Sequence, residues 1–191
     1  MKNHRNKLLS PALLQRHAKR IRLLLSDVDG VLTDGRLYYV PDGKGGIVEA
    51  KGFNSQDGMG FRWLQEAGIP AGWISGRESP GVVARAQNLQ ISYLYQNHLS
   101  KVGPYEQILE KAGVVDEEVC YMGDDLTDSP LLERVGLAVA VANAVPEVKL
   151  QAHYLTAAAG GCGAAREVIE ILLKAQGHWD QILRKYGLPA V

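Results

Sequence analysis

The chain has 191 residues, of which 46% are hydrophobic, and this length and composition indicate one globular domain over residues 1–191. The 21 basic side chains balance the 21 acidic ones, so the formal net charge is zero. That balance removes the electrostatic reason to expect a nucleic acid or an acidic membrane surface as partner.

The first 20 residues form a basic, partly amphipathic segment that lacks the apolar core and cleavage site of a signal peptide. We expect this segment to be a helical extension that packs on the domain or on a neighbouring subunit. No apolar run in the sequence is long enough to cross a bilayer. The two cysteines, Cys120 and Cys162, lie far apart, which indicates reduced thiols and a cytoplasmic protein.

Apolar runs of strand type alternate with helical patterns along the rest of the chain. This alternation predicts an α/β fold with a three-layer, Rossmann-like parallel sheet flanked by helices. Strands are predicted over residues 21–25, 37–40, 47–50, 71–74, 91–95, 119–122, 137–141 and 154–156. Helices are predicted over residues 55–67, 80–88, 101–112, 129–135, 164–175 and 179–186.

The predicted strands over 37–40 and 47–50 are separated by PDGKGG, which predicts a β-hairpin at about 37–50. This small insertion leaves no room for a large cap domain. Residues from about 157 to 191 form a C-terminal tail with two helices.

The segment LLLSDVDGVLTDG places Asp27 and Asp29 directly after a buried strand. Side chains two apart on an extended chain point the same way, so both carboxylates can face one small volume. Two such charges repel each other unless a cation lies between them, and Mg²⁺ prefers carboxylate and carbonyl oxygens. A turn or a helix cap would explain one aspartate here, but not this whole segment.

A second acidic cluster, YMGDDLTDSP, contains Asp124, Asp125 and Asp128 and follows the strand over 119–122. In open α/β sheets, ligands bind beyond the carboxyl ends of the strands. Two neighbouring strands that end in aspartates would therefore share a metal site.

Two groups suited to a phosphoryl group come between these acidic clusters. Ser75 ends the strand over 71–74 with Arg77 nearby, and Lys101 begins a helix. Phosphoryl oxygens accept hydrogen bonds from hydroxyl groups, backbone N–H groups and ammonium groups. Taken singly, Ser75 would be explained as a helix cap and Lys101 as a solvated helix residue. Their order along the chain, between the two acidic clusters, favours a shared site instead.

These motifs resemble those of the haloacid dehalogenase superfamily of aspartate-nucleophile phosphatases. The four motifs correspond to DVDGVLTDG, ISGR, Lys101 and GDDLTD in this chain. The resemblance implies a fold of that type, with Asp27 as the nucleophile that forms an aspartyl phosphate. It implies that Asp29 protonates the leaving oxygen and then takes a proton from water.

The same resemblance implies a site for Mg²⁺. Asp27, Asp124 and the backbone carbonyl of Asp29 would bind the ion, and Asp125 and Asp128 would support it, without the pattern deciding between these two. Ser75 and Lys101 would hold the phosphoryl oxygens.

From about residue 21 to residue 177 the chain most resembles the 3-deoxy-D-manno-octulosonate 8-phosphate (KDO 8-phosphate) phosphatases, a small capless branch of that superfamily. The segments that carry this resemblance are the hairpin, the stretch FNSQDGMG and the tail TAAAGGCGAAREVIEILLKAQG. It implies a role in lipopolysaccharide biosynthesis and a homotetramer assembled by the hairpins. A neighbouring subunit would then cover the site, and the tail would be able to reach the active site of an adjacent subunit.

The substrate's carboxylate and hydroxyls are expected to bind Arg77, Asn54, Asp57 and Arg85, and a solvated charge on a helix is the alternative interpretation of Arg85. Cys162 departs from the family pattern, since the family commonly has a basic or polar residue between the tail glycines. This difference matters because a thiol cannot bind a carboxylate as a guanidinium does.

Three other interpretations are open. A phosphatase for a nine-carbon sialic-acid-type sugar phosphate would have a similar sequence. A phospho-receiver signalling module also combines a parallel sheet, acidic residues, a hydroxyl and a lysine, but it needs neither Asp29 nor the second acidic cluster. An inactive scaffold would not need competent residues at all four motif positions.

Overall fold

Two apolar strands, β1 (Leu23–Ser26) and β6 (Val119–Gly123), lie side by side at the centre of a six-stranded sheet. The computed structural model describes residues 7–190, and in it the strand order is β5-β4-β1-β6-β7-β8 with every pair parallel. The outer strands are β4 (Ala71–Ile74), β5 (Tyr93–Tyr95), β7 (Leu137–Ala140) and β8 (Tyr154–Leu155).

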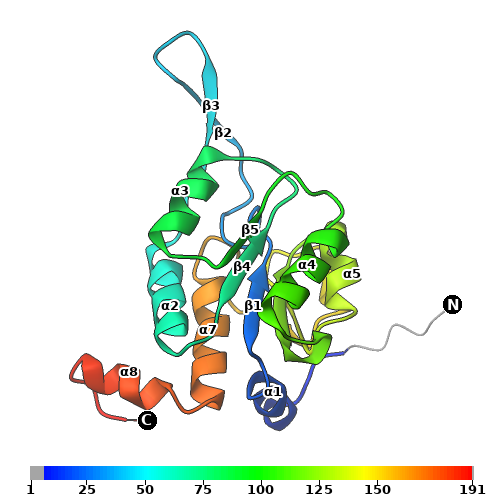
Figure 1. The fold of residues 1–191 in the computed structure, drawn as a ribbon, viewed down its shortest axis with the longest axis vertical. Helices are drawn as coiled ribbons and strands as arrows, with labels where there is room; N and C mark the ends of the chain where they lie inside the picture. The colour runs from blue at the N-terminus through cyan, green and yellow to red at the C-terminus, as the bar shows by residue number, and fades with distance from the viewer. Residues whose placement is uncertain (1–6, 191) are drawn as a thin grey trace, which may run out of the picture.

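Helices cover both faces of this sheet, which confirms the predicted three-layer α/β fold (Figure 1). Helices α2, α3 and α7 lie on one side, with α2 packed against α7, and α4 and α5 lie on the other. The helices are α1 (Pro11–Ala18), α2 (Ser55–Glu66), α3 (Pro80–Asn88), α4 (Val102–Ala112), α5 (Ser129–Leu132), α6 (Pro146–Lys149), α7 (Ala164–Ala175) and α8 (Trp179–Lys185).

The central strands are buried along their whole length because helices cover them from both sides. This explains why their sequences are nearly continuous apolar runs rather than alternating patterns. Trp73 and Tyr121 are the largest side chains that the sheet contributes to the core.

The predicted element boundaries agree with the structure to within a few residues. The first strand begins at Leu23 rather than at residue 21, and the edge strand β5 begins at Tyr93 rather than at residue 91. Ile91 instead donates its N–H to the carbonyl of Ala86 at the end of α3. Helix α6 was not predicted, and residues 1–6 of the predicted N-terminal extension lie outside the described residues.

The hairpin of β2 (Tyr38–Pro41) and β3 (Ile47–Ala50) projects from the body of the molecule (Figure 1). At its turn, Oδ1 of Asp42 accepts backbone hydrogen bonds from Lys44 and Gly46. Within residues 7–190, this hairpin is the only regular secondary structure between β1 and α2, so there is no large cap domain at this position.

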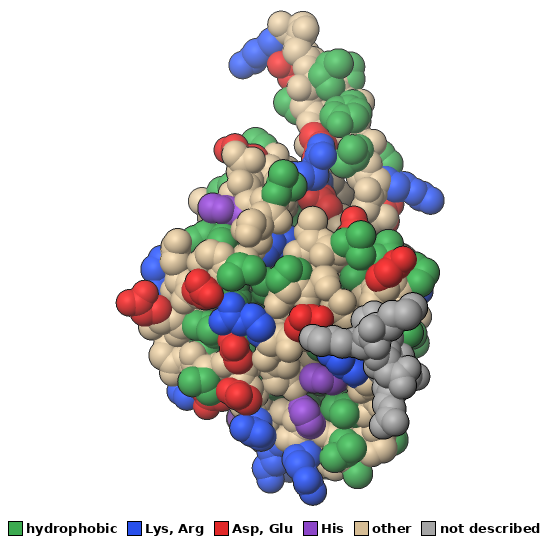
Figure 2. Space-filling model, turned by 90° about the vertical axis from the view of Figure 1, so that its right-hand side faces the viewer, with side chains coloured by type: hydrophobic (Ala, Val, Ile, Leu, Met, Phe, Trp, Pro, Cys, Tyr) green, Lys and Arg blue, Asp and Glu red, His purple; other side chains and the backbone are tan. Residues whose placement is uncertain are grey.

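Hydrophobic side chains are exposed on this hairpin, as Figure 2 shows at the top of the molecule. They are Leu37, Tyr38, Tyr39, Val40, Ile47 and Val48, and Ile47 is the most exposed of them at 72%. Exposed apolar side chains gathered in this way are typical of a protein–protein interface.

Among residues 7–190, no helix is both long enough and apolar enough to cross a membrane.

Candidate active site

The two acidic loops and the loop that contains Ser75 meet at one edge of the sheet. Asp27, Ser75 and Asp124 each follow the last residue of a parallel strand, and these three strands are neighbours in the order β4-β1-β6. Ser26 is in register with Trp73 and with Met122, so the strands end at the same level. The structure thus brings the predicted motifs together.

Lys101 links the two acidic loops. Its ammonium lies 2.5 Å from Oδ1 of Asp27 and 2.6 Å from Oδ1 of Asp128, and its side chain is only 3% exposed. A buried ammonium is stable only when carboxylates compensate for its lost hydration, and here two do so. Lys101 therefore lies against Asp27, the predicted nucleophile.

Asp128 is fully buried, and both of its oxygens are occupied. Oδ1 accepts from Lys101 and from the hydroxyl of Tyr121 at 2.7 Å, and Oδ2 accepts from the backbone N–H groups of Asp124 and Asp125. The exposed Asp125 instead caps the following turn, because its Oδ1 accepts from the N–H of Leu126. The structure thus separates the two aspartates that the sequence left equivalent: Asp128 braces the second acidic loop, and Asp125 points to a local backbone group.

The residues present fit a divalent cation. Carboxylate oxygens of Asp27, Asp124 and Asp128 lie within 4.8 Å of one another. Oδ1 of Asp124 is buried and has no hydrogen-bond partner in the described part of the chain. A buried carboxylate oxygen without a partner is costly, and a bound cation would remove that cost.

Gly30 allows Asp124 to come this close to the first acidic loop. A Cβ atom at this position would lie 2.1 Å from Oδ2 of Asp124, and the φ angle of +93° is one that only glycine adopts easily. The DVDG motif therefore needs a glycine at this position, because any larger residue would prevent the two acidic loops from coming into contact.

Crowding of carboxylates changes their acidity. Burial raises the pKa of Asp27 to about 6, although Lys101 opposes the rise. Burial, together with the charges of Asp27 and Asp128, raises the pKa of Asp124 to about 8. Both carboxyl groups therefore hold protons in the metal-free protein at a pH where ordinary aspartates are ionised.

We expect the metal-free protein to lose stability as the pH rises from about 4 to about 8. Asp27 and Asp124 keep their protons to a higher pH in the folded state than in the unfolded chain, so the unfolded state loses protons first and is favoured as pH increases. Thermal melting with a chelator between pH 5 and 8.5 measures this. Added Mg²⁺ should raise the melting temperature most at the alkaline end, and a metal-insensitive melting curve would contradict the expectation.

Asp29 contacts a lysine that the sequence analysis did not single out. Its Oδ1 forms an ion pair with Lys51, at the base of the hairpin, and its Oδ2 lies 3.4 Å from Oγ of Ser75. Lys51 also lies 2.9 Å from Glu49, which binds Arg77 at 2.5 Å. The only sequence signal for these contacts was the hairpin's position directly after the acidic loop.

The other three predicted substrate-binding residues lie together around the start of α2. Asn54 caps α2 by accepting the N–H of Gln56 at 2.7 Å, and Arg85 donates to the carbonyl of Asn54. Asp57 is buried and accepts the N–H of Arg166 at 2.7 Å. The three residues line a small cavity beneath α2, so their contacts connect α2 to α3 and α7; their assignment to substrate stays a prediction.

The tail glycines pack on the acidic loop of their own chain. Gly161 donates its N–H to the carbonyl of Val31, and Asn143 bridges Gly30 and Gly160. The exposed Cys162 lines an open cavity of about 480 Å³. That cavity also has Asp34, Tyr38, Ala50, Lys51, Gly52, Phe53 and Gly161 in its walls.

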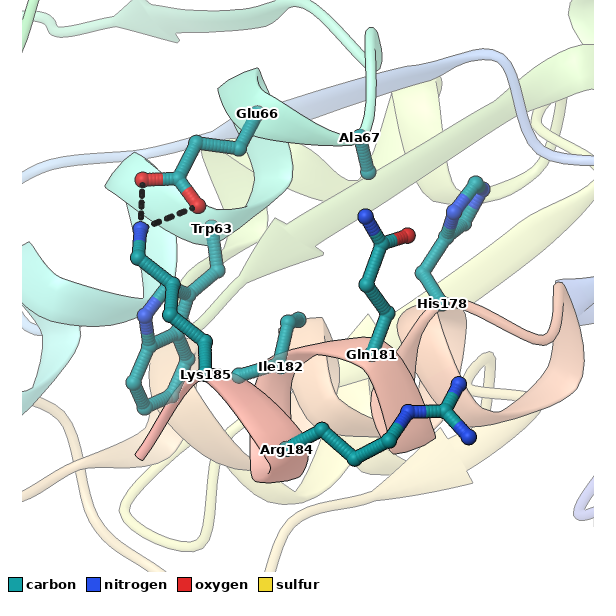
Figure 3. Close-up of a pocket in the computed structure, with 8 residues that line it drawn as sticks. All are labelled: Trp63, Glu66, Ala67, His178, Gln181, Ile182, Arg184 and Lys185. Atoms are coloured by element: carbon teal, nitrogen blue, oxygen red, sulfur yellow. Dashed lines mark hydrogen bonds and ion pairs between the residues drawn. The ribbon is translucent and has the colours of Figure 1, made fainter. Parts of the chain in front are cut away.

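A third cavity, of about 450 Å³, lies between α8 and the end of α2 (Figure 3). Its one carboxylate, Glu66, is bound by Lys185 at 2.8 Å. This cavity therefore has a single carboxylate, already ion-paired, whereas the aspartate cluster brings together three carboxyl groups that could hold a cation.

Comparisons with known proteins agree with this geometry. Residues 76–167 match a family model described as haloacid dehalogenase-like hydrolase. The chain is 45% identical over 164 residues to the 3-deoxy-D-manno-octulosonate 8-phosphate phosphatase KdsC of Escherichia coli (strain K12), covering 86% of this chain and 85% of that protein.

Two solved structures of enzymes with that name are also similar. The one from Yersinia pestis has a TM-score of 0.82 and 42% identity, and the match covers 87% of this chain and 88% of that one. The one from Moraxella catarrhalis, in complex with magnesium ion, phosphate ion and KDO, has a TM-score of 0.87 and 34% identity over 93% of this chain and 99% of that one.

Proposed function

This chain belongs to the 3-deoxy-D-manno-octulosonate 8-phosphate phosphatase family of haloacid dehalogenase-like hydrolases, and we propose that it hydrolyses KDO 8-phosphate to KDO and phosphate with Mg²⁺. Membership of this family makes it a phosphoric monoester hydrolase, which sets aside the receiver module and the inactive scaffold. The observation that carries the proposal is the cluster of Asp27, Asp124 and Asp128 at the carboxyl edge of the sheet, with Lys101 paired to Asp27 and Asp128.

Asp27 is the proposed nucleophile. One of its carboxylate oxygens bonds to phosphorus while the bond from phosphorus to the sugar oxygen breaks, and Asp29 gives that oxygen a proton. A water oxygen then bonds to phosphorus while the bond to Asp27 breaks, and Asp29 takes a proton from that water. Covalent transfer splits one difficult displacement into two easier ones.

Asp27, Asp124 and the backbone carbonyl of Asp29 would hold Mg²⁺, with Asp128 bracing the loop that carries Asp124. When bound, the ion offsets the negative charge of nucleophile and phosphate, so that the two anions can approach each other. Asp124 supports this assignment, because its carboxylate belongs to the cluster and its buried Oδ1 has no hydrogen-bond partner among residues 7–190.

Ser75 and Lys101 are the proposed donors to the phosphoryl oxygens. Lys101 already lies against Asp27, and Ser75 begins the loop after the neighbouring strand β4. Donors fixed in place before the reaction stabilise the charge that develops during transfer. Arg77, half-exposed beside the same loop, would bind the carboxylate of the sugar acid.

A phosphate-release screen with and without Mg²⁺ tests the proposal. The panel should contain KDO 8-phosphate, a nine-carbon sialic-acid-type sugar phosphate and hexose phosphates that lack a carboxylate. We expect Mg²⁺-dependent release to be fastest from KDO 8-phosphate. Faster release from the nine-carbon substrate would replace the proposed substrate with the alternative one. A cytoplasmic reaction that supplies lipopolysaccharide biosynthesis is the setting we propose on the same basis.

We also propose that the hairpins assemble a homotetramer in which a neighbouring subunit covers the site. The exposed apolar side chains of β2 and β3 support this proposal, because an isolated hairpin of this kind is poorly covered by its own chain. A site without a cap domain would also be open to water unless another subunit closed it.

Ile47→Asp is expected to disrupt this assembly. Its side chain is 72% exposed within the chain, so a charge there costs the isolated subunit little but would be buried in an interface between subunits. Light scattering after gel filtration should give a smaller mass than for the unaltered protein. Lys44→Asp, at the exposed turn of the same hairpin, is the control, and a monomeric unaltered protein would contradict the proposal.

A further inference from the structure

Lys51 is an enclosed cation at the base of the hairpin, just after β3. Its side chain is 1% exposed, and its ammonium pairs with Asp29 and lies 2.9 Å from Oε1 of Glu49. Lysine is rarely buried this far unless carboxylates compensate for its lost hydration. The hairpin thus carries a buried positive charge directly to the proposed acid and base.

Asp29 is held from two sides by these neighbours. Lys51 binds Oδ1, and the hydroxyl of Ser75 lies 3.4 Å from Oδ2. A separation of 3.4 Å is long for a hydrogen bond from a hydroxyl, so the ion pair with Lys51 is the stronger restraint. Without Lys51, the carboxyl group of Asp29 could rotate about its last side-chain bond.

Lys51 is itself kept in place by a chain of alternating charges. Glu49 shares its carboxylate between Lys51 and Arg77, whose Nη2 lies 2.5 Å from Oε2. Arg77 also donates its backbone N–H to the hydroxyl of Ser75 at 3.1 Å. The contacts therefore close a ring from the hairpin to the loop after β4 and back to Asp29.

We propose that Lys51 is a positioning residue that aligns the Asp29 carboxyl group for its two proton transfers. This inference rests on the proposed phosphatase function and adds the hairpin to the machinery of the same site. Lys51 neither gives nor takes a proton in it. Proton transfer depends steeply on alignment, and a misplacement of about 1 Å can cost roughly 100-fold in rate.

A comparison of leaving groups tests this role. Lys51→Met should lower kcat/KM by roughly 30-fold on the sugar phosphate that the unaltered protein hydrolyses best, because a departing alkoxide needs a proton. On p-nitrophenyl phosphate the loss should stay below about threefold, because its phenolate leaves without one. Lys51→Arg keeps the cation and should recover most of the activity on the sugar phosphate.

Lys44→Met is the matched control, since it removes an exposed lysine from the turn of the same hairpin and should leave both values of kcat/KM unchanged. Equal losses on the two substrates in Lys51→Met, or no loss on the sugar phosphate, would overturn the role of Lys51. A preference of the unaltered protein for another sugar phosphate would overturn the substrate proposal instead, and Lys51 would then be tested on that preferred substrate.

Discussion

Asp27→Asn is expected to lower kcat for phosphate release by at least about 10⁴-fold while the protein remains folded. The amide has nearly the shape of the carboxyl group, but it carries no negative charge with which to attack phosphorus. No covalent phosphoryl intermediate should form, and acid-quenched samples of the variant should contain no phosphorylated protein. Phosphate release under saturating Mg²⁺ measures the loss.

The fold should survive this change because Lys101 keeps a second partner. Its ammonium lies 2.6 Å from Oδ1 of Asp128, and the new amide oxygen can still accept a hydrogen bond from it. Asp34→Asn is the control, since Asp34 belongs to the same loop but is exposed, with its carboxylate accepting from Arg36 and Tyr38. Substantial turnover by Asp27→Asn would remove Asp27 from the role of nucleophile.

Asp124→Asn is expected to abolish Mg²⁺-dependent activity and, in the same protein, to stabilise the metal-free fold. Burial and the neighbouring charges of Asp27 and Asp128 raise the pKa of Asp124 to about 8. Near pH 7 the metal-free protein therefore has to take up a proton at this position on folding, which costs free energy that an amide does not cost. We expect a gain of about 1 kcal/mol or more, or roughly 2–4 °C in Tm for a domain of this size.

Melting curves with a chelator and with Mg²⁺ separate the two effects. The unaltered protein should melt at a higher temperature when Mg²⁺ is added, whereas Asp124→Asn should not respond. The fall in stability toward pH 8 should also become shallower in the variant. Asp125→Asn is the matched comparison, because asparagine can cap the N–H of Leu126 as aspartate does, and it should keep its response to Mg²⁺. A lower melting temperature for metal-free Asp124→Asn would contradict the proposed crowding of carboxylates.

The order of strands and helices along the chain was predictable because each central strand is buried on both faces, so that its sequence is a continuous apolar run. The run over residues 119–122 corresponds to β6 almost residue for residue. The edge strand β5 was predicted too long because backbone contacts at the end of α3, and not side-chain type, decide where pairing begins. Helix α6 was missed because its four residues are too few for a helical period to appear.

Candidate site residues were predictable where a motif places them at a strand end. Asp27, Asp124 and Ser75 follow strands that turned out to be neighbours, so the parallel sheet carries them to one edge. Lys51 was missed because a lysine after an exposed hairpin has no distinctive sequence environment. Asn143 was missed because the two residues that it bridges, Gly30 and Gly160, lie more than a hundred positions apart in the sequence.

By itself, the sequence determined the α/β layers, the absence of room for a large cap, and the motif residues from which a metal and phosphoryl site could be predicted. Those features depend on local patterns, namely apolar runs, turn residues and the two-residue periodicity of a strand. Only the tertiary structure decided that Asp128 is enclosed while Asp125 caps a turn, and that Lys51 pairs with Asp29. Burial and ion pairing between segments distant in sequence depend on how the strands and loops come together, so neighbouring residues of the same type can have different surroundings.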